Sequence, residues 1–497
     1  MADDCDDADA SAHPGAPETA YDGVDQDCSG AELDDLDADG YALDEDCNDD
    51  DGGVHPGAAE TWANAFGDDD CDDMLDQDSP LLFGETLWYS TVENATLGST
   101  VEPYVDVDGD GLPEVLAAAV ATTRTFAGSG AVYLLSPASS GDVDTGASRV
   151  VDAGGAGWYL GVALETEDFD GDGWPDVLTT ASGKDGKGSG YLVSGAALAA
   201  GNIRLPEDAA QAFEGAELAA YWGSDIAFLG DIDGDGTGEV AMSASPATAG
   251  GVASAGRVAV FSLDGADRST SEPDYAWSGY YEGGRFGETV VSVGDVDGDG
   301  LPDTLVSAEQ GDIFVVLPGR SGSMADVALS RVTRDGDSSR YRTVPVGDLD
   351  GADGADVLVL GPERALAFTG LGTFTLRTQA EAWLEVRAAP GSAFADAVDL
   401  GDRTGDGRPE TLITRTWSPE DATSWIGVLM GEDLAWRAEI DADQLDISAL
   451  STRPSAASGY RAAVAGSAPG VIALGGITDD RGAPGGGSVA IVAAPDQ

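Results

Sequence analysis

An acidic nine-residue pattern recurs along this 497-residue chain and constrains its fold more than any other feature. The regular copies read Asp-x-Asp-Gly-Asp-Gly-x-x-(Asp/Glu) and begin at Asp106, Asp168, Asp231 and Asp295. Two irregular copies begin at Asp348 and Asp402. The copies follow one another at intervals of 53 to 64 residues, and self-similarity at a nearly fixed period indicates a repeat architecture.

The residues around each acidic pattern predict strands and not helices. An aromatic residue or leucine with glycine stands upstream, as in "YLGVAL" and "RFGETV", and apolar runs such as "GAVYLL" and "GRVAVF" follow downstream. Short runs rich in β-branched residues and separated by glycine turns are typical of strands. About four such runs fall in each repeat, which is the content of one blade of a β-propeller.

The two ends of the repeat region predict how many blades there are. Residues 460–494 keep the strand and turn pattern but carry "GSAPG" in place of the acidic loop, so we expect a seventh blade without a metal. Residues 81–90, "LLFGETLWYS", are expected to supply a strand that completes the last blade, because a closed ring leaves no exposed sheet edge. We therefore predict an all-β fold, with a seven-bladed β-propeller over residues 81–497.

Each acidic loop predicts a calcium site. The side chains at positions 1, 3 and 5, the carbonyl at position 7 and the acid at position 9 are expected to face one centre, and the glycines permit the tight backbone. Without an ion these carboxylates would repel one another. An oxygen-only, flexible loop favours Ca²⁺ over Mg²⁺, and the propeller region lacks the His and Cys that Zn²⁺ or copper would prefer. The predicted ligands are Asp106, Asp108, Asp110, Leu112, Glu114; Asp168, Asp170, Asp172, Trp174, Asp176; Asp231, Asp233, Asp235, Thr237, Glu239; and Asp295, Asp297, Asp299, Leu301, Asp303.

The two irregular loops are expected to bind a cation weakly or not at all. Ala352 stands where the third Asp belongs in one loop, and Thr404 stands where the second belongs in the other. Their candidate ligands are Asp348, Asp350 and Asp356, and Asp402, Asp406 and Glu410. A solvated acidic turn without metal is the alternative for every loop. An EF-hand is excluded, because position 12 of the regular loops is Ala, Thr, Met or Val where a Glu is required, and strands flank the loops.

Charge excludes several classes of partner. The chain carries 92 acidic against 23 basic residues, a formal net charge of -69, so nucleic acid and anionic lipid would be repelled. No apolar run reaches the roughly 20 residues of a membrane helix, so we predict no transmembrane segment. No signal peptide is visible at the first residues, and any export signal is expected to lie outside this numbering.

The first 80 residues form a tandem duplication of their own. Each copy runs from an Asp-Cys pair through His-Pro-Gly-Ala-x-Glu-Thr to a second Asp-Cys pair. The cysteines of a copy are too far apart for a zinc knuckle, so the simplest prediction is two disulfides, Cys5 with Cys28 and Cys47 with Cys71. Asp35, Asp37 and Asp39 lie between the copies at the alternate spacing of a hard-cation loop, with a flexible acidic linker as the alternative. His13 and His55 sit in His-Pro-Gly turns, which favours a structural role over metal ligation.

Both parts of the chain resemble known families. The copies in residues 3–78 resemble the "putative metal-binding motif" of secreted and surface-attached bacterial proteins. Residues 90–495 resemble the FG-GAP repeats of integrin α-subunit propellers and their bacterial relatives. The second resemblance implies a structural calcium ion in a hairpin of each metal-bearing blade and a ligand bound by loops on the opposite face.

These features lead to one expected function and two alternatives. We expect a secreted or surface-exposed, calcium-binding scaffold that binds a protein or glycan partner, with the partner and the oligomeric state left open. A carbohydrate-active enzyme on a calcium-stabilised propeller is the first alternative, because paired carboxylates are abundant, although serine-hydrolase and zinc-protease motifs are absent from the sequence. The second is an extracellular protein whose purpose is to sequester cations.

Overall fold

The computed structural model divides the chain into two compact units. The first consists of Met1–Phe83 with Ile447–Ala449, and the second of Gly84–Asp446 with Leu450–Gln497. The structure describes residues 13–14, 16, 25–28, 40–42, 55–56, 86–110, 112–308, 312–316, 321–333, 342–346, 356–361, 364–368, 376–378, 382, 384–387, 394–401, 410–415, 424–429, 439–441, 450–451, 460–465, 471–476 and 488–493. No helix among these residues is long and apolar enough to cross a membrane.

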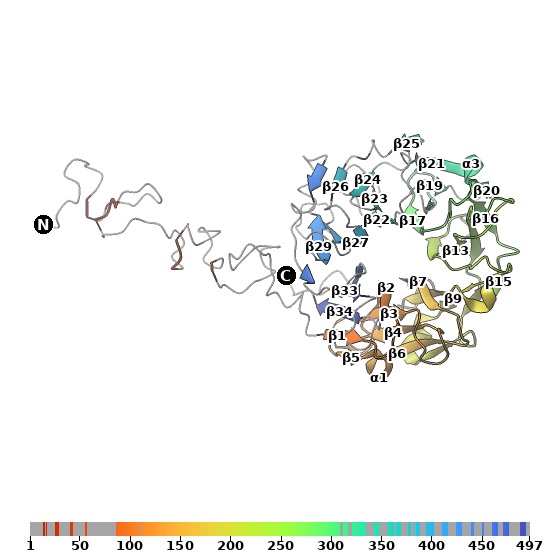
Figure 1. Cartoon of the computed structure of the whole chain (residues 1–497), viewed down its shortest axis with the longest axis horizontal. Coiled ribbons are helices and arrows are strands. Elements are labelled where there is room, and N and C mark those ends of the chain that lie inside the picture. Colours follow the sequence, from red (N-terminus) through yellow and green to blue (C-terminus); the bar gives the residue numbers. More distant parts are fainter. Residues whose placement is uncertain are drawn as a thin grey trace. The chain divides into compact units, whose positions relative to one another are not determined.

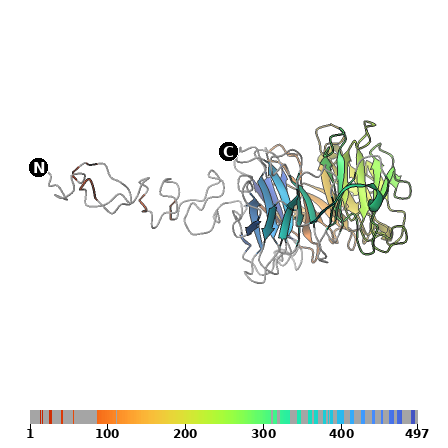
Figure 2. The same cartoon turned by 90° about the horizontal axis from the view of Figure 1, so that it is seen from above.

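The described strands of the second unit form seven separate sheets, and Figure 1 shows them arranged about a common centre. Viewed from above, the strands run in much the same direction through the thickness of the unit (Figure 2). Helices are short: α1 (Val143–Gly146), α2 (Gly195–Ala200), α3 (Met324–Val327) and the 3-10 turn η2 (Lys184–Gly186). The prediction of an all-β fold is therefore confirmed.

Four of the sheets each contain one regular acidic loop. The first has the order β10 (Ile203–Leu205), β6 (Arg149–Ala153), β4 (Ala131–Leu135), β3 (Val115–Ala119), β2 (Leu97–Pro103). The second has the order β15 (Arg268–Ser269), β11 (Gln211–Glu214), β9 (Ser189–Val193), β8 (Asp176–Ala181), β7 (Leu160–Glu167). The third has the order β12 (Ile226–Gly230), β13 (Glu239–Ala244), β14 (Arg257–Ser262), β16 (Tyr275–Ser278), β20 (Gly322–Ser323). The fourth has the order β17 (Val290–Gly294), β18 (Asp303–Ser307), β19 (Ile313–Val316), β21 (Ala328–Thr333), β25 (Leu376–Thr378).

The remaining three sheets come from the last third of the chain and from its first described strand. One has the order β22 (Arg342–Val346), β23 (Asp356–Leu360), β24 (Arg364–Phe368), β26 (Leu384–Arg387), β30 (Glu439–Asp441). The next has the order β27 (Phe394–Gly401), β28 (Glu410–Arg415), β29 (Ser424–Leu429), β31 (Leu450–Ser451). The last has the order β32 (Tyr460–Ala465), β33 (Val471–Gly476), β34 (Ser488–Ala493), β1 (Thr86–Tyr89), β5 (Gly141–Asp142).

The last sheet joins the two ends of the repeat region. Strand β1 pairs antiparallel with β34, and Trp88 lies opposite Val489. The Trp88 indole is buried and its Nε1 donates to the Ser136 carbonyl oxygen at 3.1 Å, just after β4 in the neighbouring sheet. The strand predicted within residues 81–90 is therefore present as β1 in the last sheet, and its role in closing a ring stays a prediction.

Most sheets contain a fifth strand that the sequence did not predict. Strands β10, β15, β20, β25, β30 and β5 each pair in parallel with the outermost strand of one sheet, but each belongs in sequence to the next sheet along the chain. The expected four strands per repeat are thus joined by one short strand from a neighbour. Each such pairing covers an outer edge and ties two consecutive sheets together.

The hydrophobic core lies between neighbouring sheets. On β3, Val115 and Ala117 pack in a cluster with Trp88, whereas Leu116 and Ala118 pack in a second cluster with strands β7 and β8. Successive side chains of a strand point to opposite faces, and both faces of this sheet are buried. This explains why its central strands are uninterrupted apolar runs.

Glycines allow consecutive sheets to approach each other closely. Gly130, Gly188 and Gly256 form isolated parallel bridges with Leu160, Trp222 and Phe286, respectively. A Cβ built on Gly188 would lie 1.9 Å from the Trp222 carbonyl oxygen, and Gly188 has a φ of 83°. Only glycine fits this joint between sheets.

Candidate metal centres

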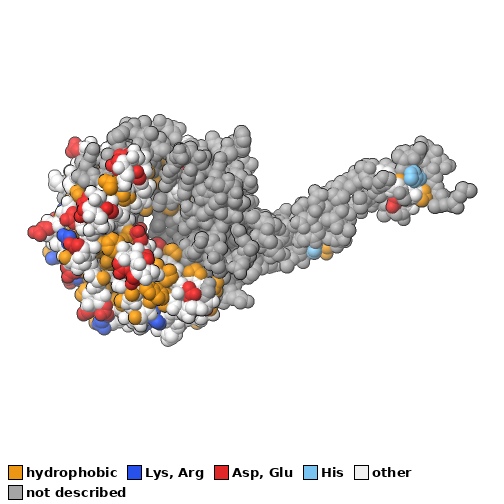
Figure 3. All heavy atoms as spheres, turned by 180° about the vertical axis from the view of Figure 1, so that it is seen from behind, with side chains coloured by type: hydrophobic (Ala, Val, Ile, Leu, Met, Phe, Trp, Pro, Cys, Tyr) orange, Lys and Arg blue, Asp and Glu red, His pale blue; other side chains and the backbone are white. Residues whose placement is uncertain are grey.

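All four regular acidic loops connect the first strand of a sheet to the second. Residues 104–114 join β2 to β3, and the equivalent loops join β7 to β8, β12 to β13 and β17 to β18. The acid at position 9 is the first residue of the second strand, or the residue directly before it, so the sheet fixes its backbone. On the face drawn in Figure 3, acidic side chains gather in separate groups, as expected for loops that follow equivalent strands.

The loops fold by hydrogen bonds from backbone amides to their own carboxylates. Asp295 Oδ1 accepts from the Gly298 amide at 2.7 Å, and Asp299 Oδ1 accepts from the Leu301 amide at 2.9 Å. Asp231, Asp235 and Gly234 repeat this arrangement in the preceding sheet. The glycine at position 4 has a φ of 76° at Gly234 and 81° at Gly298, a conformation that suits glycine. The sequence therefore folds each loop around its acids locally.

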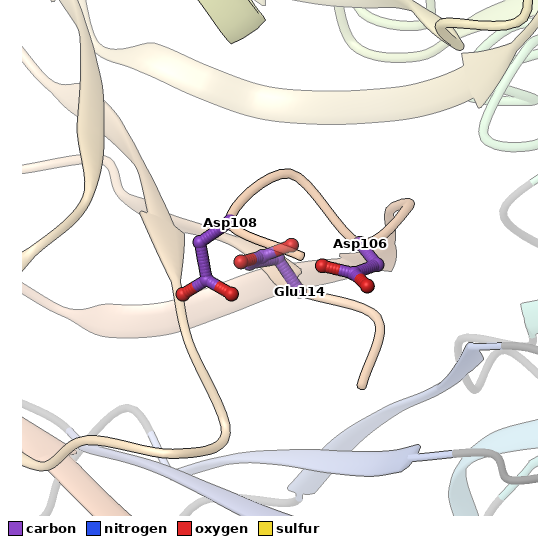
Figure 4. A group of neighbouring side chains, drawn as sticks. All are labelled: Asp106, Asp108 and Glu114. Carbon is purple, nitrogen blue, oxygen red and sulfur yellow. The ribbon is translucent and has the colours of Figure 1, made fainter. Parts of the chain in front are cut away.

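Carboxylate oxygens converge in all four regular loops, but two different sets of positions do so. In the loops that end in Glu, the converging groups are Asp106, Asp108 and Glu114 (Figure 4), and Asp231, Asp233 and Glu239. In the loops that end in Asp, they are Asp168, Asp170 and Asp172, and Asp295, Asp297 and Asp299. The ligand oxygens of each group lie within 4.8 Å of one another. Glu is one methylene longer than Asp, which lets position 9 reach the cluster.

The acids at position 9 are buried, and two of them keep an oxygen without a partner. Glu114 and Asp303 are both 0% exposed. Glu114 Oε2 accepts from the Val107 amide at 2.6 Å, and Asp303 Oδ2 accepts from the Val296 amide at 3.0 Å. Glu114 Oε1 and Asp303 Oδ1 have no hydrogen-bond partner. A buried carboxylate oxygen without a partner is costly, and a hard divalent cation fits this donor set of oxygens.

The other two acids at position 9 have local partners that the sequence did not reveal. Glu239 Oε1 accepts from the Ser262 hydroxyl at 3.1 Å, at the end of β14. Asp176 Oδ1 accepts from the Gly195 amide at 2.9 Å, at the start of α2. The four loops are therefore similar in sequence but not equivalent in how their ninth residue is held.

Burial and mutual repulsion raise the pKa of these acids. Burial, with the charges of Asp108 and Asp106 adding to it, raises the pKa of Glu114 to about 7. The same causes raise the pKa of Glu239 to about 7 and that of Asp303 to about 6. A bound cation would favour the charged form of each group, so protons and cations compete for these sites.

One further residue contacts a predicted ligand from a distant strand. The Tyr275 hydroxyl on β16 donates to Asp233 Oδ2 at 3.0 Å. Tyr275 lies 42 residues from Asp233, and no sequence pattern connects the two. Because β16 and the loop belong to the same sheet, this contact ties the loop to the outer part of that sheet.

Several predicted site residues lie outside the described residues. These are Asp35, Asp37, Asp39, Asp348, Asp350, Asp402, Asp406, Cys5, Cys47 and Cys71. Asp356 is buried at the start of β23, and Glu410 begins β28, so both occupy the place of a ninth-position acid. Cys28 is disulfide-bonded, and its predicted pairing with Cys5 stays a prediction.

Tryptophan side chains contribute to the packing between the sheets. Trp222 and Trp277 are 1% and 2% exposed and lie in the clusters between sheets. Trp158 is partly buried, and Lys184 Nζ lies 5.1 Å from the centre of its ring.

Comparisons with known proteins agree with both resemblances. The family described as "Putative metal-binding motif" matches residues 4–32 and 46–77, and the family described as FG-GAP repeat matches residues 160–193. Integrin alpha-PS2 of Drosophila melanogaster is 32% identical over 155 residues, which cover 30% of this chain and 10% of that protein. Integrin alpha-5 of Xenopus laevis is 29% identical over 177 residues, which cover 32% of this chain and 16% of that protein. The chain thus spans only a small part of the length of these relatives.

Proposed function

We propose that this chain, which carries an FG-GAP repeat and two copies of the acidic, cysteine-containing motif, is a calcium-stabilised scaffold that binds a protein or glycan outside the cell. The described residues form an all-β fold, and the chain resembles integrin α chains and contains metal-binding motifs. We propose in addition that the ion is calcium, that the sheets form a closed ring, that the partner is a protein or glycan and that the protein acts outside the cell.

The observation that carries the proposal is the pair of buried carboxylate oxygens without partners, Glu114 Oε1 and Asp303 Oδ1. Calcium accepts six to eight oxygen ligands in flexible geometry, and Asp106 and Asp108 supply further oxygens beside Glu114. The ion would offset the repulsion within each acidic group and order the loop at the edge of its sheet. We propose the same role for the other regular loops, including the carbonyls at position 7.

We also propose that the seven sheets are the blades of one closed propeller. The first strands of consecutive sheets contact each other, as β2 contacts β7 and β7 contacts β12, and β32 of the last sheet contacts β2 of the first. The pairing of β1 with β34 supports closure in the same way. Residues 1–80 would then form a separate module, held by disulfides and bound cations.

The partner is proposed to bind loops on the face opposite the acidic loops. Tyr159, Leu218 and Tyr221 are 44%, 74% and 49% exposed, and they lie in connections between one sheet and the next. Tyr159 and Tyr221 have φ values of 54° and 50°, a strained conformation for a bulky residue. Exposed aromatic side chains held by strained backbone are typical of recognition sites.

Calcium titration by calorimetry, combined with thermal unfolding in calcium and in EDTA, tests the proposal. A scaffold should bind at least four ions in its second unit, one in each regular loop. Its melting temperature should fall in EDTA. Extracellular modules bind calcium at roughly 10⁻⁴ to 10⁻³ M. Equal stability in calcium and EDTA would overturn the structural role of the ion.

The same titration separates the scaffold from a cation-sequestering protein. The acidic motifs in residues 4–32 and 46–77 are the observation that favours sequestration. A sequestering protein should bind many more ions, weakly, with little change in melting temperature. Turnover of a polysaccharide substrate in the presence of calcium would instead favour the enzymatic alternative.

A further inference from the structure

We infer that cation binding at the loop of residues 231–239 is coupled to cation binding at the neighbouring loop of residues 295–303, so that filling one site strengthens the other. The inference rests on the proposed cation binding and concerns how two sites communicate. It is carried by contacts between the two loops and between the strands beneath them.

Two side chains of the second loop lie directly on a glycine of the first loop and on the glycine that ends the strand before it. A Cβ built on Gly234 would lie 3.4 Å from Leu301 Cδ2, and one built on Gly230 would lie 3.2 Å from Pro302 Cγ. Both glycines have positive φ values, 76° and 77°. Leu301 and Pro302 therefore pack against the backbone of the preceding loop, with no side chain in between.

The residues in contact are part of the cation-holding framework on both sides. The Leu301 amide donates to Asp299, and Leu301 stands at position 7, where the carbonyl is expected to face the ion. Gly234 donates its amide to Asp231 Oδ1 at 2.7 Å. An ion that fixes the backbone from 299 to 303 thus fixes the two side chains that press on the loop around Asp231.

The strands below the loops are linked by hydrogen bonds between the sheets. Asp225 Oδ2 accepts from the Val290 amide at 2.7 Å, and the Ser292 hydroxyl donates to the Leu229 carbonyl oxygen at 3.3 Å. Leu229 directly precedes Gly230. A shift of one loop relative to the other must therefore work against β12 and β17, which leaves each loop with few independent positions.

Site-resolved hydrogen exchange by mass spectrometry tests the coupling in the full chain. The readout is the calcium concentration at which peptides covering residues 231–239 gain half of their protection. The double variant Asp295→Asn/Asp297→Asn disables the neighbouring loop and should raise this midpoint about tenfold. The matched control, Asp106→Asn/Asp108→Asn, disables a loop with no described contact to residues 231–239 and should leave the midpoint unchanged.

Two further variants complete the test. Leu301→Ala keeps every carboxylate and carbonyl but removes the contact with Gly234, so it should raise the midpoint in the same direction. Because coupling is reciprocal, Asp231→Asn/Asp233→Asn should raise the midpoint of residues 295–303 by the same factor as the forward experiment.

Unchanged midpoints in the Asp295→Asn/Asp297→Asn variant would overturn the inference while leaving the proposed function intact. If calcium protects neither loop in the wild-type protein, the proposed function fails as well. Should the double variant lose protection in β17, β18 and β19, the Leu301→Ala variant decides: a raised midpoint supports coupling, and an unchanged one overturns it.

Discussion

At the scale of single residues, the ninth-position acids of the regular loops differ in how their oxygens are satisfied. Glu114 and Asp303 have a buried oxygen without a partner, whereas Ser262 already satisfies one oxygen of Glu239. A loop whose buried acid keeps one oxygen without a hydrogen bond gains most from an ion. We therefore expect the regular loops to differ in affinity even though their sequences are similar.

Replacing the buried acid of the first loop should remove a calcium site. Glu114→Gln keeps the size of the side chain and its contact with the Val107 amide but removes the charge that faces Asp106 and Asp108. We expect the affinity of this loop to fall about tenfold or more, seen as one fewer bound ion in native mass spectrometry. Glu93→Gln, at an exposed position outside the loop, is the control and should keep every ion. Retention of full stoichiometry by Glu114→Gln would contradict the assignment.

The raised pKa values predict an unusual dependence of stability on pH. The pKa of Glu114 is about 7 in the fold and its ordinary value is 4.5, so the cation-free fold binds the proton more tightly than the unfolded chain. The free energy of unfolding without calcium should therefore fall as pH rises from about 4.5 to about 7, by up to about 1.4 kcal/mol for each pKa unit of each such acid.

Melting temperatures measured across this pH range in EDTA and in saturating calcium check the prediction. Because a bound calcium ion would take the place of the proton, the melting temperature should fall much less with rising pH in calcium than in EDTA. The variant Glu114→Gln/Glu239→Gln should show a shallower fall in EDTA than the wild type. An identical pH profile in this variant would show that other groups cause the effect.

At the scale of elements, glycine joints and shared strands hold the sheets together. The bridge between Gly188 and Trp222 brings two backbones into contact. At the outer edge, β11 pairs with β15, a strand that lies in sequence between two strands of the next sheet. A sheet is therefore attached to its neighbour both near the start of β9 and at its outermost strand. Each attachment depends on backbone atoms, which limits what a substitution can relieve.

A glycine at a joint should tolerate alanine less than a glycine of similar conformation in open space. Gly188 and Gly265 have φ values of 83° and 79°, but only Gly188 has a backbone atom within 1.9 Å of an added Cβ. Gly265→Ala should cost about 1–2 kcal/mol for the left-handed backbone alone. Gly188→Ala should lower the free energy of unfolding by at least about 3 kcal/mol relative to the wild type, because the sheets must move apart. Chemical unfolding measures this loss. Equal losses in the two variants would argue against a tight joint.

At the scale of the whole molecule, the proposed closure of the propeller would depend on strand β1. Strand β1 completes the last sheet from the start of the second unit, and its Trp88 is buried against the neighbouring sheet. A net charge of -69 opposes compaction, so both the closing strand and bound cations are expected to matter for stability.

Two truncations separate the first unit from the closing strand. Removal of residues 1–83 deletes only residues of the first unit and should leave the melting temperature of the second unit nearly unchanged. Removal of residues 1–90 also deletes β1 and should lower the melting temperature markedly, because β34 loses one of its two neighbouring strands and the Trp88 side chain is removed from the core. Differential scanning calorimetry in calcium measures both. If the two truncations melt alike, closure by β1 is wrong.

The geometry of each acidic loop depends on a short stretch of the chain, so the sequence alone was sufficient to predict it. The acids and glycines of one loop lie within nine residues, and their hydrogen bonds run between positions two to five apart, so the loop geometry follows from backbone sterics. Short apolar runs likewise predicted the strands, the recurring acidic pattern predicted the repeat, and the need to cover a sheet edge predicted that residues 81–90 supply a strand to the last sheet.

Tertiary structure alone decided which distant groups meet. Tyr275 reaches Asp233, Ser262 reaches Glu239, Leu301 lies on Gly234, and short strands cross to the neighbouring sheet. These partners come from other strands or other sheets, and their meeting depends on how whole sheets pack, so no local pattern records it. The sequence determined where acidic side chains gather, and packing determined which of these acids find hydrogen-bond partners and which loops touch.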